Sequence, residues 1–303
     1  MPDNQKIWDI IVVGGGPAGL SAATVLARSR RSVLIIDEGK QRNLRSHGLH
    51  NYLTRDGILP PDFLELAAAE LNNYPIAIHK EKVVLATKEE DGFRLGTEVD
   101  QYRCRRLLIA TGVTDHVPDI PGMRELWGNS VFHCPFCDGY ECKDTIVGLY
   151  ARKYNGYGMA LALRHLSEKV FLFTDGAYYL KLSQRRELER RGVDVITKKI
   201  QRLQHDGKKL FSVELDGGIT IPCNSLFTHH GFSVNNDLLL QLGCKCSGKG
   251  PAVTNRKQQT SVEGVYAAGD ASFDMHFVIV AAAEGVKAGV AIHNDLLKED
   301  QNQ

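Results

Sequence analysis

A glycine-rich turn near the N-terminus is the feature that most restricts how this chain can fold. An apolar, β-branched run at residues 8–13 ends in Gly14-Gly15-Gly16-Pro17-Ala18-Gly19, and the sequence from 20 to 27 predicts a helix rich in alanine and leucine. Gly14 permits a tight turn, Gly16 lets the backbone approach a pyrophosphate, and Gly19 lets the helix pack against the strand. The pattern predicts the first strand, turn and helix of a dinucleotide-binding unit.

Two acidic residues follow at the spacing expected for such a unit. A second predicted strand, residues 32–36, leads into Asp37 and Glu38, about 20 residues beyond the turn, where an acid binds a ribose hydroxyl. The N-terminus of the intervening helix faces the phosphates. The candidate cofactor-binding residues of this part are therefore Gly14, Gly16, Pro17, Ala18, Gly19, Asp37 and Glu38.

Two later strands end in similar segments. The predicted buried strand 106–110 leads into Ala110-Thr111-Gly112, and the predicted strand 265–268 leads into Gly269 and Asp270. Ligands of doubly wound sheets bind at the carboxyl ends of strands, so Ala110, Thr111, Gly112, Gly269 and Asp270 are further candidates for cofactor binding. A structural role for Asp270, as the cap of the helix predicted from about 277 to 297, is the alternative.

The order of elements begins again after residues 118–122, a stretch rich in proline and glycine that predicts a hinge. Before the hinge, short strands are predicted at 83–87, 93–97 and 101–103. After it, strands are predicted at 145–150, 169–173, 193–197 and 225–228, with helices at 157–166 and 181–191. The repeated order predicts an α/β fold with two doubly wound, Rossmann-like domains.

Reactive side chains are concentrated in Cys134-Pro135-Phe136-Cys137-Asp138, which we call the redox segment. A zinc site needs four ligands, usually with a second pair at similar spacing, and Cys244-Lys245-Cys246 has a single intervening residue, so no metal site is expected. A carboxylate beside a cysteine pair suits thiol–disulfide exchange, which needs an exposed thiol and a group that moves protons. The sequence predicts Cys134, Cys137 and Asp138 as catalytic residues, and a purely structural cysteine pair remains the alternative.

The charge balance and the cysteines restrict the class of protein. Lys and Arg number 37 against 36 Asp and Glu, which gives no electrostatic basis for binding nucleic acid or an anionic membrane. We expect no membrane span and no cleavable leader, because no long apolar run precedes the first strand. Seven scattered cysteines are unlike the paired framework of a secreted domain, and we expect a cytoplasmic protein.

Taken together, the segments 14–19, 110–112, 134–138 and 267–270 resemble the low-molecular-weight thioredoxin reductases over nearly the whole chain. The resemblance implies domains of the three-layer ββα FAD/NAD(P)-binding type. It implies an FAD domain made of residues 1–117 and 245–303, and a central NAD(P)-binding-like domain, residues 118–244, that carries the redox pair. It also implies FAD as cofactor, thioredoxin or a thioredoxin-like protein as partner, and a homodimer.

The same resemblance assigns roles to single residues. Cys137 is expected against the flavin, Cys134 is expected to attack the substrate disulfide, and Asp138 is expected to be the acid–base group. Asp270 is expected to hold the ribityl chain of the flavin. The polar loop 40–57 could cover the cofactor, with Asn43 and Asn51 as predicted contacts, whereas the sequence leaves the roles of His47 and His50 open.

Other details resemble an atypical branch. Asp37-Glu38-Gly39 followed by Arg42-Asn43, and Cys137 followed closely by Gly139-Tyr140-Glu141, are similar to gliotoxin-type dithiol oxidases. A nicotinamide site should have a second glycine motif after the strand 145–150, yet the sequence at 150–154 is Tyr-Ala-Arg-Lys-Tyr. Where cations for a 2′-phosphate are expected, Thr174-Asp175 is followed by tyrosines at 178 and 179. Such losses resemble the ferredoxin-dependent and deeply rooted thioredoxin reductases.

Three hypotheses follow. The first is an FAD-dependent disulfide reductase that uses NADPH poorly, with ferredoxin as a possible donor, or an ordinary NADPH-dependent enzyme with a divergent nucleotide site. The second is a dithiol oxidase that uses O₂. The third is a flavin-binding protein with a structural disulfide and no turnover. The tyrosines at 150, 154, 157, 178 and 179 are expected to pack, with flavin covering as the alternative.

Overall fold

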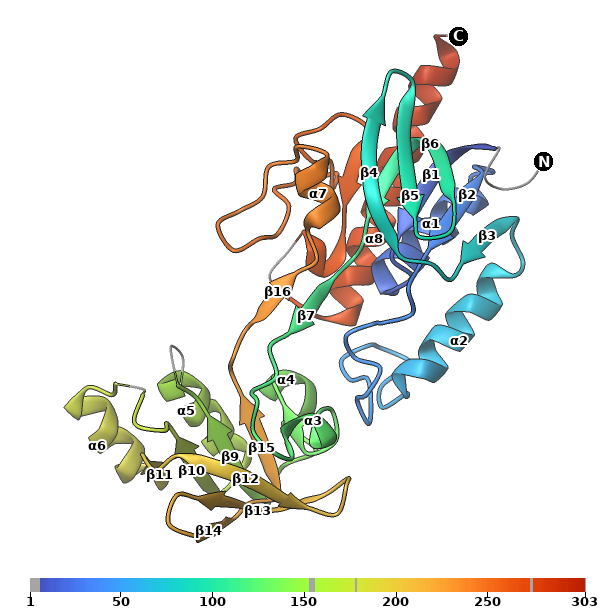
Figure 1. Cartoon of the computed structure of the whole chain (residues 1–303). Coiled ribbons are helices and arrows are strands. Elements are labelled where there is room, and N and C mark those ends of the chain that lie inside the picture. Colours follow the sequence, from blue (N-terminus) through green and yellow to red (C-terminus); the bar gives the residue numbers. More distant parts are fainter. Residues whose placement is uncertain (1–5, 153–155, 178, 273–274, 303) are drawn as a thin grey trace.

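The computed structural model describes residues 6–152, 156–177, 179–272 and 275–302, and it is a mixed α/β protein with two principal sheets (Figure 1). Lys153, Tyr154 and Tyr178, which the sequence analysis singled out, lie outside the described residues. Among the helices of the described ranges, none is both long and apolar enough to cross a membrane.

The first sheet has the strand order β3-β2-β1-β6-β5-β4, with β17 beside β6. Its strands come from both ends of the chain, because β17 (Val265–Ala267) pairs in parallel with β6 (Gln101–Ile109). The others are β1 (Ile7–Val13), β2 (Val33–Ile36), β3 (Ile76–His79), β4 (Val83–Glu89) and β5 (Gly92–Thr97). Two details differ from prediction: β3 was not expected, and the strands expected at 101–103 and 106–110 are the single strand β6.

Two helices that are far apart in the sequence pack together on one face of the first sheet. They are α1 (Pro17–Arg28) and α8 (Val278–Gln301), and both contribute to the same buried cluster of alanine, leucine and isoleucine side chains. Beside them lies α2 (Pro60–Leu71), which begins at two consecutive prolines (Figure 1). The first and last segments of the chain therefore form one core.

The second sheet is entirely parallel, with the order β11-β10-β9-β15-β8. Its strands are β8 (Val131–Phe132), β9 (Ile146–Tyr150), β10 (Lys169–Phe173), β11 (Val193–Ile196) and β15 (Ser225–Thr228). Helices α5 (Gly156–Leu166) and α6 (Leu182–Arg190) pack beside it, and α3 (Met123–Leu126) precedes it. A three-stranded antiparallel sheet of β12 (Ile200–His205), β13 (Leu210–Leu215) and β14 (Ile219–Pro222) completes this part.

Two short antiparallel strands join the parts that contain the two sheets (Figure 1). We call them the linking strands: β7 (Val113–Asp115) runs outward and β16 (Phe232–Val234) returns. After β16, α7 (Asp237–Gln241) packs on β4, and its Leu238 and Leu239 lie in the core of the first sheet. The predicted boundaries at 118 and 244 stay predictions; these core contacts lead us to propose that the second boundary lies at β16.

Candidate functional site

A cavity of about 980 Å³ lies where the glycine turn, the loop after β2 and the redox segment meet. It reaches the linking strand β7, Asn235 directly after β16, and the segment after β17. The predicted residues that line it are Gly14, Gly16, Pro17, Ala18, Asp37, Glu38, Asn43, Ala110, Thr111, Gly112, Cys137, Asp138, Gly269 and Asp270. Gly19, Asn51 and Cys134 are not among the described residues that line it.

The glycine turn has the geometry that the sequence predicted. Gly14 has φ +109°, and a Cβ there would lie 2.3 Å from the carbonyl oxygen of Ala110. A Cβ on Gly19 would lie 1.9 Å from the carbonyl oxygen of Gly14, so Gly19 contributes through helix packing. A Cβ on Gly16 would have no described atom within 4 Å, because this residue faces the cavity. The space beside Gly16 fits a pyrophosphate at the N-terminus of α1.

Asp37 binds the turn itself. Its carboxylate accepts hydrogen bonds from the backbone N–H of Gly15 (2.9 Å) and Gly39 (3.1 Å), and from Nε2 of Gln41 (2.7 Å). The neighbouring Glu38 is more exposed, lines the cavity and pairs with Lys40 at 2.9 Å. The ribose role that was expected of this acidic pair therefore suits Glu38 better, and it remains a prediction for both residues.

The turn that contains Gly269 and Asp270 depends on a residue that the sequence analysis missed. Glu284 in α8 is buried, and its Oε2 accepts from the backbone N–H of Gly269 (2.8 Å) and from the hydroxyl of Ser272 (3.0 Å). Gly269 has φ +69°, a conformation that favours glycine. The buried carboxylate of Glu284 thus holds the turn that carries Asp270 into the cavity; its place inside an alanine-rich helix was the available signal.

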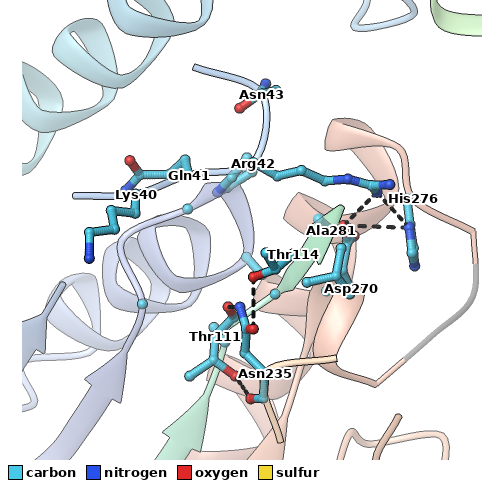
Figure 2. A pocket seen from close by; sticks show the side chains of 18 of the residues that line it. Lys40, Gln41, Arg42, Asn43, Thr111, Thr114, Asn235, Asp270, His276 and Ala281 are labelled. Carbon is cyan, nitrogen blue, oxygen red and sulfur yellow. Dashed lines mark hydrogen bonds and ion pairs between the residues drawn. The ribbon is translucent and has the colours of Figure 1, made fainter. Parts of the chain in front are cut away.

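Ala110-Thr111-Gly112 is joined to the returning chain by Asn235 (Figure 2). Thr111 Oγ1 donates to the carbonyl oxygen of Asn235 (2.6 Å), and Asn235 Nδ2 donates to the carbonyl oxygen of Thr111 (2.9 Å). Thr114 Oγ1 also donates to Asn235 Oδ1 (3.0 Å). Sequence reasoning missed Asn235, because nothing local indicates that it meets a segment more than 120 residues away.

The redox segment places its two sulfurs differently. Cys134 and Cys137 form a disulfide, with their Cα atoms 5.3 Å apart, across the single turn α4 (Pro135–Asp138). Cys137 lines the cavity, whereas Cys134 lies beyond it. Asp138 is 6% exposed, and burial raises its pKa to about 6, with Glu141 adding to the rise. A carboxyl group with that pKa is present in both protonation states near neutral pH.

The loop 40–57 lies against the redox segment. His50 lies between Asp56 and Glu141: its Nδ1 is 3.4 Å from the Asp56 carboxylate and its Nε2 is 3.4 Å from the Glu141 carboxylate. The His47 ring packs edge-on against Phe132. Asn51 Nδ2 donates to the carbonyl oxygen of Phe136 at 2.9 Å. In this structure Asn51 thus contacts the redox segment, and its predicted cofactor contact stays a prediction.

At the carboxyl ends of the second sheet, side chains fill the point where a dinucleotide would be expected. Tyr150 at the end of β9 is buried and stacks on His230 (ring centroids 4.7 Å apart). Its hydroxyl donates to Asp175 at 2.6 Å, and Asp175 also accepts from the backbone N–H of Ile200 at 3.0 Å. The carboxylate of Asp175 therefore points inward, because Tyr150 and the backbone of Ile200 satisfy it.

Comparison with known proteins identifies the family. A family model described as "Pyridine nucleotide-disulphide oxidoreductase" matches residues 8–285. The chain belongs to this family. It is 31% identical to "Thioredoxin reductase tcpT" of Claviceps purpurea, covering 99% of this chain and 97% of that one. It also superimposes, with a TM-score of 0.91, on a putative thioredoxin reductase from Bacillus anthracis (33% identity; 97% and 99% coverage). HlmI gives the same TM-score (35% identity; 98% and 94% coverage).

These findings confirm the predicted fold class and the resemblance to thioredoxin reductases. The protein is a flavoprotein disulfide oxidoreductase, so the hypothesis of a binding protein without turnover is excluded. Its cofactor is FAD, and the open space at Gly16 fits the phosphates of this cofactor.

Replacing Gly16 by valine tests the cofactor site. The backbone at Gly16 is extended (φ −81°, ψ −177°), which valine can adopt, and its side chain would enter the cavity without meeting a described atom. We expect the Gly16→Val apoprotein to be as stable as wild-type apoprotein but to bind little FAD, as measured by the ratio of flavin to protein absorbance. Full flavin content would contradict the assignment of this turn.

Gly19→Ala is the matched control. Its added carbon would lie 1.9 Å from a backbone oxygen, so it should lower the free energy of unfolding, whereas Gly16→Val should not.

The pKa of Asp138 predicts a pH dependence for opening the disulfide. Below about pH 6 the carboxyl group is protonated and can donate to the thiolate that leaves, a contribution of about 10²–10⁴ in rate. We expect wild type to exceed Asp138→Asn most strongly at pH 5 and the ratio to shrink above pH 7, measured as reduction of the disulfide by a dithiol. Glu141→Gln is the control for loss of a nearby charge. A ratio independent of pH would assign Asp138 a structural role.

Proposed function

We propose that this protein is an FAD-dependent thiol–disulfide oxidoreductase that reduces thioredoxin or a thioredoxin-like protein. The observation that carries the proposal is the position of the Cys134–Cys137 disulfide, with Cys137 on the cavity, Cys134 outside it and the buried Asp138 adjacent. Relatives named thioredoxin reductase, which cover nearly the whole chain, support this choice of substrate.

The two cysteines have different roles in this reaction. As a thiolate, Cys134 attacks the substrate disulfide and forms a mixed disulfide, and one substrate sulfur leaves and takes up a proton. Cys137 next attacks the sulfur of Cys134, which releases the second substrate thiol and restores the Cys134–Cys137 disulfide. Bound FAD supplies the electron pair that returns this disulfide to two thiols. Asp138 exchanges protons with the sulfurs, since its pKa of about 6 makes both protonation states available.

The electron donor that we propose is not a nicotinamide dinucleotide but another reductant, with ferredoxin as the first candidate. Such dinucleotides bind at the carboxyl ends of the strands of a doubly wound sheet. In the second sheet, Tyr150 stacks on His230 there and donates to Asp175. A dinucleotide would have to displace these groups and break a partly buried hydrogen bond. An ordinary NADPH-dependent thioredoxin reductase is the alternative that the donor experiment below tests.

A dithiol oxidase of gliotoxin type is the second candidate. Two aromatic side chains in and next to the redox segment are exposed, since Phe136 is 76% exposed and Tyr140 is 66% exposed. A small apolar dithiol would bury part of this surface. The reaction would run in reverse, with the substrate oxidised to a disulfide and O₂ taking up two electrons and two protons to give hydrogen peroxide.

We propose a cytoplasmic homodimer. The other five cysteines form no disulfide in the described part of the chain, which suits a reducing compartment. Exposed apolar residues follow one face of α8 at intervals of seven, four and seven residues, and such a face suits pairing with a second copy. They are Ile279, Val286, Val290 and Leu297.

Single substitutions of the two cysteines test their roles. Cys134→Ser leaves Cys137 as a thiol on the cavity that contains FAD, so we expect long-wavelength absorption that rises as the thiolate forms with pH. Cys137→Ser should lack that absorption because Cys134 lies outside the cavity. The opposite pattern would reverse the roles.

Anaerobic titration tests the electron donor. Separate samples of oxidised protein receive NADPH, NADH, reduced ferredoxin or a small dithiol, and bleaching of the flavin is followed. We expect slow bleaching by both nicotinamide dinucleotides and faster bleaching by ferredoxin or the dithiol. Rapid stoichiometric bleaching by micromolar NADPH would overturn the donor proposal and favour an ordinary thioredoxin reductase. Peroxide formed from a dithiol in air, without another donor, would favour the oxidase.

A further inference from the structure

Arg42 connects three distant parts of the chain beside the cavity, and Figure 2 shows its side chain against Asp270 and His276. Its guanidinium forms a bidentate pair with Asp115 at the end of the linking strand β7, with Nε 2.9 Å from Oδ2. The same group lies 3.6 Å from Oδ2 of Asp270 and 2.7 Å from Nδ1 of His276. It also lies 5.6 Å from the ring centre of Phe232 on the linking strand β16. Thus one side chain contacts both linking strands and the motif that contains Asp270.

The charges of this cluster are balanced by Arg42. Nδ1 of His276, which lies 2.7 Å from Nη1 of Arg42, also lies 3.8 Å from Oδ2 of Asp270. Asp115 and Asp270 share the cation of Arg42. Their side chains are 8% and 20% exposed, and that of Arg42 is 15% exposed. Burial raises the pKa of Asp270, which opposes its ionisation. Arg42 lowers the pKa of Asp270 and Asp115 raises it, so removal of Arg42 would disfavour the ionised form of Asp270.

We propose that Arg42 is a positioning residue that holds Asp270 ready for FAD and fixes the linking strands relative to it. The inference rests on the proposed function, in which Asp270 binds the cofactor and Cys137 approaches it. The redox segment belongs to the part of the chain that the linking strands carry. The guanidinium of Arg42 would therefore affect both the position of Asp270 at the cofactor site and the position of the Cys134–Cys137 pair.

The test is FAD titration of apoprotein in a double-mutant cycle. Arg42→Met should raise the dissociation constant of FAD about 10- to 100-fold, the range of coupling between groups in direct contact. Asp115→Asn by itself should have a smaller effect. Adding Asp115→Asn to Arg42→Met should recover about tenfold, since it removes the carboxylate that repels Asp270. Such recovery would show that the loss of affinity in Arg42→Met comes from unbalanced charge. If the loss came from missing packing contacts of Arg42, adding Asp115→Asn would not restore affinity.

Arg31→Met is the matched control, because Arg31 has a side chain 10% exposed and pairs with Asp300 at 2.7 Å, away from the cavity. It should lower stability without changing FAD affinity. Arg42→Lys, which keeps the charge but loses the bidentate geometry, should give an intermediate loss and serves if Arg42→Met does not fold. Unchanged FAD affinity in both Arg42 variants, or no recovery in the double variant, would overturn the role in cofactor binding.

A second readout tests the linking strands. At saturating FAD, the long-wavelength absorption of Cys134→Ser should weaken when Arg42→Met is added, because the redox segment is less well placed. An unchanged band would overturn this part of the inference. Failure of the proposed function looks different, since wild type would then bind FAD with normal affinity and yet fail to exchange disulfides.

Discussion

Backbone contacts through glycine hold the two ends of the chain together, and the cavity depends on them. A Cβ at Gly285 of α8 would lie 2.0 Å from the carbonyl oxygen of Ala18 in α1, and a Cβ at Gly269 would lie 3.0 Å from the Cβ of Ala18. The glycine turn near the N-terminus and the turn at Gly269, some 250 residues later, therefore both approach Ala18 closely. Any larger residue at Gly285 would separate the helices and with them the two sides of the cofactor site.

The elements that sequence could predict are those with strong local signals. The glycine turn, the paired carboxyl ends of β1, β6 and β17, and the repeated order of the second sheet all follow from apolar runs and turn residues. The linking strands could not be predicted, because each has only three residues, too few to show a periodic pattern. Likewise β6 was divided in two, since the charged pair Arg105 and Arg106 interrupts its apolar pattern; both side chains form ion pairs with the end of α8.

Side-chain partners of the site were predicted less well than its backbone. Asp37, Glu284 and Asn235 act on the backbone of the glycine turn, the turn at Gly269 and the 110–112 segment, respectively. These backbone partners lie 15 to 124 residues away in the sequence, and local patterns carry no information about such contacts. Asp175 shows the same limit: its position in the chain was read correctly, but its direction depends on Tyr150 and Ile200.

The second sheet raises the question of why a nucleotide-like domain keeps its fold when its own ligand position is filled. Its edge strand β8 pairs with β15 and ends two residues before Cys134, so the sheet determines where the redox segment begins. Filling the carboxyl ends with Tyr150 and His230 adds buried contacts to that sheet. Because a mobile segment loses entropy each time it is positioned, a rigid sheet favours repeated presentation of the disulfide to the cavity. Positioning of the redox segment is by itself enough reason to keep the fold.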